Sequence, residues 1–179
     1  MEYTILMPCL NEEKTLKFCI DEAMGYIREN NLDAEVLIAD NGSCDNSISI
    51  AERCGARVIC VSEKGYGAAL MGGIKNAFGK YIIMGDSDGS SDFSSLTPFI
   101  SKLNDGYEMV VGNRFKGGIE KGAMPFSHKL GVPFLSVLAK WKFKAPVSDF
   151  HCGLRAFSKE KALSLNLKSP GMEFATEII

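Results

Sequence analysis

The sequence of 179 residues has little of what nitrogen- or sulfur-rich metal sites need. It contains only two histidines, His128 and His151, and its six cysteines include no Cys-x-x-Cys pair. Zinc sites are built from clustered Cys and His, and disulfide-rich domains space their cysteines densely. The sequence therefore disfavours a zinc centre and a disulfide framework, and it indicates reduced cysteines in a cytosolic setting.

Long apolar runs are also absent. No stretch approaches the roughly 18 uninterrupted apolar residues that a membrane-spanning helix needs. The chain starts with an acid, Glu2, and no basic stretch precedes the short apolar run, which is not the pattern of a secretory signal. The length and a hydrophobic fraction of 46% predict one globular domain over residues 1–179.

Charge is unevenly distributed along the chain. The formal net charge of the whole is −2, yet the stretch from Arg114 to Lys144 holds seven lysines and arginines against one acid, Glu120. A basic segment of this kind is typical of a surface that meets an anionic partner, and it also occurs as a plain solvated face. Both interpretations stay open here.

The same region carries an apolar stripe. Between Phe126 and Trp141, apolar residues recur every three or four positions, which predicts a helix that Pro133 kinks or divides. A stripe of this kind docks a helix on a sheet or lays it at a membrane surface. The sequence leaves both possibilities open.

Short apolar runs alternate with longer amphipathic stretches over the first 113 residues. The pattern predicts strands at 3–8, 34–40, 56–61, 80–85 and 108–113, and helices at 12–30, 43–55, 67–79 and 92–106. We expect Ser43 or Asp45 to cap the second of these helices and Asp92 to cap the fourth. Such alternation predicts an α/β fold with a mainly parallel central sheet covered by helices on both faces.

Each predicted strand runs into a polar cluster. In chain order these are "PCLNEE", "DNGSCD", "SEKGYG", "GDSDGSSD" and "GNRF". Ligands bind beyond the carboxyl ends of the strands in sheets of this type. Five clusters on one edge therefore predict a single extended site.

The cluster "MGDSDGSSD" places Asp86 and Asp88 one residue apart after an apolar strand. Alternate residues of an extended chain point the same way, so both carboxylates can face one ligand, and Mg²⁺ or Mn²⁺ would bridge them to a diphosphate. An EF-hand loop is excluded, because the sixth and twelfth positions from Asp86 are Ser91 and Thr97. The alternative is a solvated turn that caps the next helix, which explains Asp92 better than Asp86.

Two other positions allow a ligand or a turn. Asp40 ends the second predicted strand, where its carboxylate can accept a hydrogen bond from a base or ribose or can form an Asx turn with Gly42. Lys64 precedes two glycines, Gly65 and Gly67, at a helix start that suits a phosphate or a plain turn. The residues alone do not decide between these interpretations.

With these motifs in order, the chain resembles the family 2 glycosyltransferases of the GT-A fold. The matching segments are "MPCLNEE", "DNGSCDNS", "KGYGAAL", "DSDG", "GNRF" and "SDFHCGLRAF". Within that family the chain is most similar to the dolichol-phosphate mannosyltransferase-like branch. The resemblance implies sugar transfer, with inversion, from a UDP- or GDP-sugar to a polyprenyl phosphate at the cytoplasmic face of a membrane, with Mg²⁺ or Mn²⁺ as cofactor.

The resemblance also implies roles for individual residues. It places Asp86 and Asp88 at the metal and diphosphate, Arg114 at a phosphate, and Asp149 and Arg155 at the sugar and acceptor. The nucleotide is expected against Pro8, Leu10, Asn11, Glu12, Asp40, Asn41, Gly42, Ser43, Asp45, Lys64, Gly65, Gly67, Asp86 and Ser87. An acceptor hydroxyl would need a base, for which Asp149 is the candidate, and its alternative role is to pair with Arg155 or a lysine.

The sequence departs from the family pattern in places. Ser90 stands where many relatives have glutamine, and "SDFHCGLRAF" differs from the mannosyltransferase version, so the sugar stays open. The chain ends at "GMEFATEII", inside an expected helix, so we expect a truncated domain whose longer form carries a membrane anchor.

Four other functions compete with sugar transfer to a polyprenyl phosphate. A sugar nucleotidyltransferase would normally have a G-G-x-G-T-R segment where this chain has "PCLNEE", which disfavours it. Transfer to a saccharide hydroxyl and a non-catalytic nucleotide-binding module both stay open. Nucleic-acid binding is disfavoured, because the basic stretch lacks interleaved aromatics on a strand and the whole chain is slightly acidic.

Overall fold

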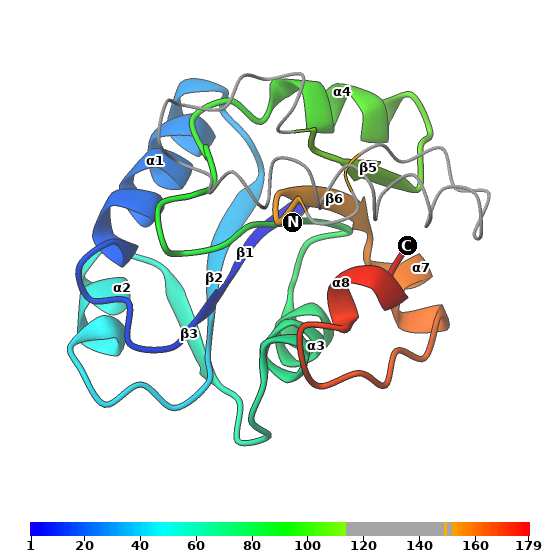
Figure 1. Ribbon diagram of the computed structural model, residues 1–179. Coiled ribbons are helices and arrows are strands. Elements are labelled where there is room, and N and C mark those ends of the chain that lie inside the picture. The colour runs from blue at the N-terminus through cyan, green and yellow to red at the C-terminus, as the bar shows by residue number, and fades with distance from the viewer. Residues whose placement is uncertain (114–148, 150–151) are drawn as a thin grey trace, which may run out of the picture.

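The computed structural model describes residues 1–113, 149 and 152–179 (Figure 1). The strands are β1 (Tyr3–Cys9), β2 (Ala34–Asp40), β3 (Arg57–Cys60), β4 (Tyr81–Met84), β5 (Met109–Val111) and β6 (Arg155–Ser158). The helices are α1 (Leu16–Glu29), α2 (Ser47–Arg53), α3 (Tyr66–Asn76), α4 (Thr97–Asn104), α7 (Lys159–Ser164) and α8 (Phe174–Glu177). The predicted basic stretch, the apolar stripe, Arg114 and both histidines lie outside the described residues.

The strands form one six-stranded sheet in the order β3-β2-β1-β4-β6-β5. The pairs β1–β2, β1–β4 and β2–β3 are parallel, whereas β6 runs antiparallel to both of its neighbours. The prediction of a mainly parallel sheet is confirmed, and the sequence analysis missed β6. The chain continues from β1 to β2 toward one edge of the sheet, and from β4 toward β6 and β5 at the other edge, so the connections diverge between β1 and β4. Ligands bind at such a point in α/β sheets.

Helices cover both faces of the sheet, as Figure 1 shows. On one face, α1, α2 and α4 pack on alternate side chains of β1 and β2, such as Ile5 and Val36. On the other, α3, α7 and α8 pack on the intervening side chains, such as Leu6 and Leu37. Successive strand residues point to opposite faces, so a strand buried on both faces is apolar throughout. The result is a three-layered α/β/α arrangement.

Two predicted helix caps are wrong. The helix α2 begins at Ser47 with Asn46 as its N-cap residue, so neither Ser43 nor Asp45 holds that position, although Oδ1 of Asp45 accepts a hydrogen bond from the amide of Ser47 at 3.0 Å. The helix α4 begins at Thr97, five residues after Asp92, with a proline in its first turn. The carboxylate of Asp92 instead accepts hydrogen bonds from the backbone and side chain of Ser94. Proline at a helix start, rather than the acid before it, marks where α4 begins.

No helix in the described ranges has the length and apolar content that crossing a membrane requires. All six cysteines are free thiols, which agrees with the prediction from their spacing.

A buried carboxylate joins three segments at the amino end of the sheet. Glu35 accepts hydrogen bonds from Thr4 Oγ1 at 2.8 Å, the amide nitrogen of Phe78 at 2.7 Å and Arg57 Nε at 2.8 Å. The hydroxyl of Thr4 in turn accepts from the amide of Gly79 at 2.9 Å. The backbone of Ala77 is extended, so α3 ends at Asn76 and not at Gly79 as the sequence predicted.

Replacing Glu35 tests this connection. Burial by itself raises the pKa of Glu35, but hydrogen bonds from Arg57, Phe78 and Thr4 outweigh it and lower the pKa. The ionised carboxylate therefore stabilises the fold above the unfolded pKa of about 4.3, and this contribution is lost as the pH falls through the lower folded value. We expect Glu35→Gln to reduce the free energy of unfolding at pH 7 by about 1–2 kcal/mol.

Urea unfolding between pH 7 and pH 3 measures the effect. The difference between wild type and Glu35→Gln should shrink toward the acid end. Glu52→Gln, on the exposed side of α2, is the matched control and should unfold like wild type. A difference that is the same at every pH would contradict the assigned role of the ionised carboxylate.

Candidate active site

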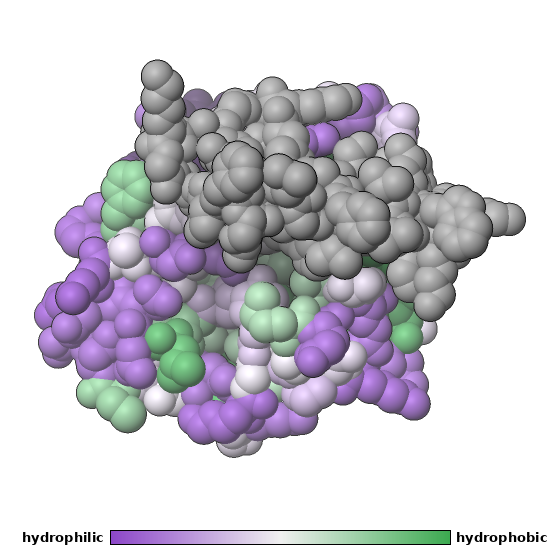
Figure 2. Space-filling model, viewed as in Figure 1, coloured by the Kyte–Doolittle hydropathy of each residue, from purple (hydrophilic) through white to green (hydrophobic). Residues whose placement is uncertain are grey.

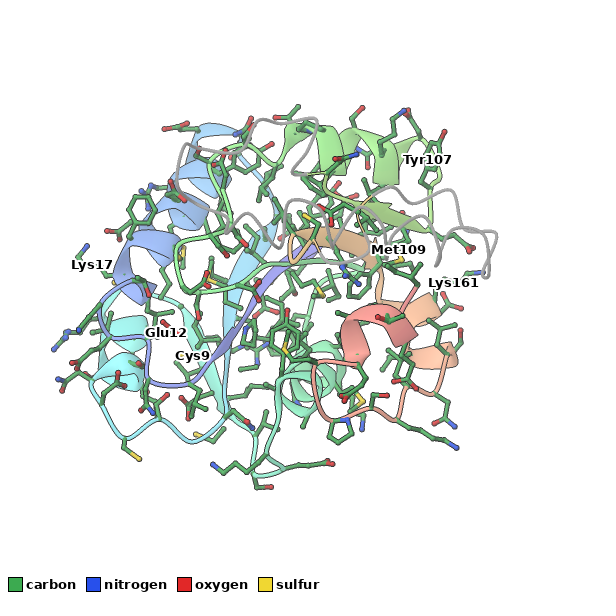
Figure 3. The ribbon with its side chains drawn as sticks, viewed as in Figure 1. Cys9, Glu12, Lys17, Tyr107, Met109 and Lys161 are labelled. Atoms are coloured by element: carbon green, nitrogen blue, oxygen red, sulfur yellow. The ribbon has the colours of Figure 1, made fainter. Side chains whose placement is uncertain are left out.

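A cavity of about 450 Å³ opens at the carboxyl ends of β1 and β4. Ligand sites in proteins typically have volumes of roughly 300–1,000 Å³. Figure 3 labels Cys9 and Glu12 where the chain leaves β1. The cavity is lined by Pro8, Cys9, Leu10, Glu12, Asn41, Lys64, Gly65, Tyr66, Ala69, Asp86, Ser87, Asp88 and Met172.

The Asp-Ser-Asp segment, residues 86–88, is hydrogen-bonded to the end of β1. The hydroxyl of the buried Ser87 donates to the carbonyl oxygen of Pro8 at 2.7 Å. Asp86 and Asp88 on either side of it both line the cavity. The sequence analysis expected the two carboxylates to point the same way because alternate residues of an extended chain do so. That expectation is wrong, because β4 ends at Met84 and Asp88 lies in a turn rather than in extended chain.

The two aspartates differ in their surroundings. Asp88 is exposed, and its Oδ1 accepts a hydrogen bond from the amide of Ser90 at 2.9 Å. Asp86 is half-buried, and its Oδ1 accepts from the phenol of Tyr66 at 2.9 Å. Burial raises the pKa of Tyr66, and the charge of Asp86 raises it further, so the phenol stays protonated as a donor. Asp88 therefore presents the more accessible carboxylate to a ligand.

A second cavity of about 300 Å³ adjoins the first. It is lined by Tyr66, Asp86, Gly153, Arg155, Met172, Glu173, Ala175 and Thr176. The first cavity shares Tyr66, Asp86 and Met172 with this one, so these three residues form the boundary between them.

Arg155 is a buried cation beside this boundary. Its side chain is 1% exposed and donates to the backbone carbonyls of Cys152 and Ala175. Burial lowers the pKa of Arg155, and the phenol of Tyr66, Cys152 and the carboxylates of Asp149 and Asp86 oppose that effect. Asp149 is equally buried, at 1% exposure. Both predicted residues thus lie close together inside the protein, and Arg155 reaches the second cavity.

Asn41 and Lys64 connect two loops at the edge of the first cavity. The side-chain amide of Asn41 donates to the carbonyls of Val61 and Glu63 and accepts from the amide of Gly65. Lys64 Nζ donates to the backbone carbonyl of Asn41 at 2.7 Å. The ammonium group therefore borders the cavity from a fixed position, where it can meet an anionic ligand.

The glycines of "KGYG" are explained by packing. A Cβ on Gly65 would lie 2.2 Å from the carbonyl oxygen of Pro170, and one on Gly67 would lie 2.2 Å from that of Ser169. The amide of Ala68 donates to the carbonyl of Pro170 at 3.0 Å. Protein acceptors thus occupy part of the α3 N-terminus, for which the sequence left a phosphate and a plain turn open. Gly65 still borders the cavity, whereas Gly67 is buried outside its lining.

Other predicted nucleotide residues form turns and loop contacts beside the cavity. The buried carboxylate of Asp40 accepts from the amides of Gly42 and Ser43, which is the Asx turn. The hydroxyl of Ser43 accepts from the amide of Asn11, and Asp45 accepts from the amide of Glu13. None of Asn11, Asp40, Gly42, Ser43 and Asp45 belongs to the cavity lining. These contacts hold the loops after β1 and β2 together.

The sequence analysis did not assign four of the residues that line the first cavity: Cys9, Tyr66, Ala69 and Met172. Tyr66 could have been assigned from the sequence, because it stands inside the quoted "KGYG" segment. Met172 could not, because it lies in a segment that packs on α3 but is far from it in the sequence. Burial raises the pKa of Cys9, so this thiol lines the wall without being a ready nucleophile.

The residues present fit a divalent cation that is held partly by the protein and partly by substrate phosphates and water. Among the residues that the structure describes, no three His, Cys, Asp or Glu side chains form a metal-binding group. Mg²⁺ binds through one or two carboxylates together with substrate phosphates and water. Asp86 and Asp88 supply two carboxylates at the cavity, so the phosphates and water would complete the coordination.

Comparisons with known proteins agree with this fold. The model of the family described as glycosyl transferase family 2 matches residues 4–163. The chain is 36% identical over 178 residues to a low-salt glycan biosynthesis hexosyltransferase of Haloferax volcanii, covering 98% of this chain and 43% of the relative. It is 31% identical over 164 residues to a dolichyl-phosphate hexose transferase of the same organism, covering 89% of this chain and 69% of the relative.

A solved structure shows the fold. The crystal structure of glucosyl-3-phosphoglycerate synthase from Mycobacterium tuberculosis, in complex with Mn²⁺, UDP and glucosyl-3-phosphoglycerate, superposes with a TM-score of 0.73 at 20% identity. The match covers 99% of this chain and 63% of that chain. The chain therefore has the predicted GT-A fold, and it spans about half the length of the first two curated relatives, at 43% and 56%.

Gly153 provides a selective test of the Asp86 position. A Cβ on Gly153 would lie 2.3 Å from Oδ2 of Asp86, which is the movable end of a side chain. We expect Gly153→Ala to turn this carboxylate away while the fold stays within about 1 kcal/mol of wild type. Affinity for Mn²⁺ with a nucleoside diphosphate should fall by roughly tenfold or more.

Calorimetric titration and urea unfolding measure the two effects separately. Gly25→Ala is the control, because no heavy atom lies within 4 Å of a Cβ at that position. Unchanged affinity in a folded Gly153→Ala protein would show that the position of Asp86 does not matter for the ligand.

Proposed function

The chain belongs to glycosyltransferase family 2, and on that premise we propose that it transfers a sugar, with inversion, from a nucleoside-diphosphate sugar to an acceptor. The observation that carries the proposal is the position of Asp86 and Asp88 on the wall of the cavity at the carboxyl ends of β1 and β4. Lys64 and Asn41 also line this cavity. A nucleotide with a diphosphate has the polar groups that such a cavity would bind.

The cation would act at the diphosphate. We propose that Asp88, the more exposed carboxylate, binds Mg²⁺ or Mn²⁺ most directly, while Asp86 supports it from beside Tyr66. The bound cation supplies neutralisation of the charge that develops on the departing diphosphate. Lys64 adds a second positive charge at the cavity edge. The base and ribose would lie toward Pro8, Leu10 and Glu12.

We further propose a polyprenyl phosphate as the acceptor. A phosphate is already an anion at neutral pH and needs no base, whereas a hydroxyl must lose a proton in the transfer. The candidate base, Asp149, is 1% exposed and interacts with the charge of Arg155, which favours a structural role. Similarity to a dolichyl-phosphate hexose transferase supports the same acceptor class. Such an acceptor implies contact with the cytoplasmic face of a membrane.

Nucleotide titration tests the donor site. We expect UDP or GDP to bind the wild-type protein in the presence of Mn²⁺, and to bind Asp88→Ala roughly tenfold more weakly or worse, because one of two protein carboxylates is lost. Calorimetry with and without Mn²⁺ measures the affinity. Asp92→Ala is the matched control, since Asp92 lies in the same loop but outside the cavity lining.

The result also separates the proposal from its alternatives. If no nucleotide binds a folded wild-type protein, the donor site is refuted. If a nucleotide binds but no sugar is transferred to any acceptor, the chain acts as a nucleotide-binding module.

A second experiment tests the acceptor. Transfer of labelled sugar should occur with a short-chain polyprenyl phosphate and not with the corresponding polyprenol. Asp149→Asn should retain the wild-type turnover number within about tenfold, whereas a general base would lose roughly 10²- to 10⁴-fold. Circular dichroism establishes that the variant is folded. Transfer to a saccharide hydroxyl, abolished in Asp149→Asn, would overturn the polyprenyl phosphate proposal.

A further inference from the structure

Met172 is a large apolar side chain left exposed at the functional site. Its exposed fraction is 67%, higher than that of the other exposed large hydrophobic residues among those the structure describes. The face seen in Figure 2 is largely hydrophilic outside its grey atoms, with separate hydrophobic patches. An apolar side chain gains free energy when a ligand removes it from water. The position of Met172 therefore calls for a functional account.

The backbone around Met172 is held in place. The carbonyl of Pro170 accepts from the amide of Ala68 in the first turn of α3. The carbonyl of Met172 accepts from the amide of Ala175, and the side chain of Phe174 is fully buried in the core. The exposed thioether thus extends from a packed segment, with only its own rotatable bonds free to adapt.

Met172 also lies on the boundary of the two cavities, together with Tyr66 and Asp86. A nucleoside diphosphate in the first cavity would direct its attached sugar toward the second, past these three residues. Tyr66 and Asp86 present polar groups that hydrogen-bond each other. Met172 presents an apolar one. A pyranose ring has the matching surfaces, with hydroxyls at its edge and C–H groups on its faces.

We propose that Met172 packs against the apolar face of the transferred sugar and is a specificity-determining residue of the site. The inference rests on the proposed donor, and it assigns Met172 to the sugar and not to the nucleotide. A sugar whose face toward Met172 carries an axial hydroxyl would pack less well, because that hydroxyl would lose water without gaining a partner. Met172 would thereby discriminate between epimers.

Leu10 offers a matched comparison. It is also apolar and 51% exposed, and it lines the first cavity without reaching the second. Replacing Leu10 by alanine should lower the affinities for a nucleoside diphosphate and for its sugar conjugate by the same factor. Replacing Met172 by alanine should lower only the affinity for the sugar conjugate. The ratio of the affinity for the conjugate to that for the free nucleoside diphosphate therefore distinguishes the roles of Met172 and Leu10.

Calorimetric titration with UDP, UDP-glucose, GDP and GDP-mannose, all with Mn²⁺, makes the test on wild type, Met172→Ala, Met172→Leu and Leu10→Ala. We expect Met172→Ala to bind the matching sugar conjugate roughly five- to tenfold more weakly and the free nucleotide unchanged. Met172→Leu should recover most of the loss, since it conserves apolar volume. Thermal unfolding should be unchanged, because the side chain is exposed.

Each other outcome overturns the inference. If Met172→Ala lowers the affinities for the nucleotide and the conjugate equally, the side chain lies at the nucleotide. If neither affinity falls, the side chain of Met172 stays in solvent. Failure of the wild-type protein to bind any of the four compounds would instead refute the proposed function itself, and this outcome is recognised without the variants.

Discussion

The pairing of β1 with β4 is the constraint on which the rest of the site depends. From these neighbouring parallel strands the chain continues in opposite lateral directions, from β1 toward β2 and from β4 toward β6 and β5, which leaves a space beyond their carboxyl ends. The hydrogen bond from Ser87 to the carbonyl of Pro8 then fixes the Asp-Ser-Asp turn against that space. Because the serine between the two acids is tied to the strand, both acids are left to border the cavity.

The two aspartates of the Asp-Ser-Asp segment differ in whether the protein itself balances their charge. Asp86 is balanced from within the protein by the phenol of Tyr66 and the buried guanidinium of Arg155, which in turn lies near Asp149. Asp88 accepts a hydrogen bond from the amide of Ser90 and faces solvent. Buried charges are tolerated only when they are paired, whereas an exposed carboxylate stays hydrated until a cation arrives. The two acids of one short motif therefore have different surroundings because different parts of the chain reach them.

The sequence predicted those features that depend on local pattern. The alternation of apolar runs located β1 to β5 and the polar clusters behind them, because each strand of a two-sided core is apolar along its length. It did not predict β6, nor that Gly65 and Gly67 make room for the backbone of residues 169–171. Met172 was missed for the same reason. All of these depend on contacts between segments about 70–100 positions apart in the chain, and no local period records such contacts.

The docking of residues 169–171 on the first turn of α3 has a consequence for the order of events during synthesis. The amide of Ala68 finds its acceptor in Pro170, so that bond cannot form until the ribosome has released a further hundred or so residues. Until then, the cavity lacks the wall that contains Met172, and the α3 N-terminus remains hydrated. Contacts of such high sequence separation form late and slowly. The nascent N-terminal portion therefore emerges with its sheet partly paired and its binding site open.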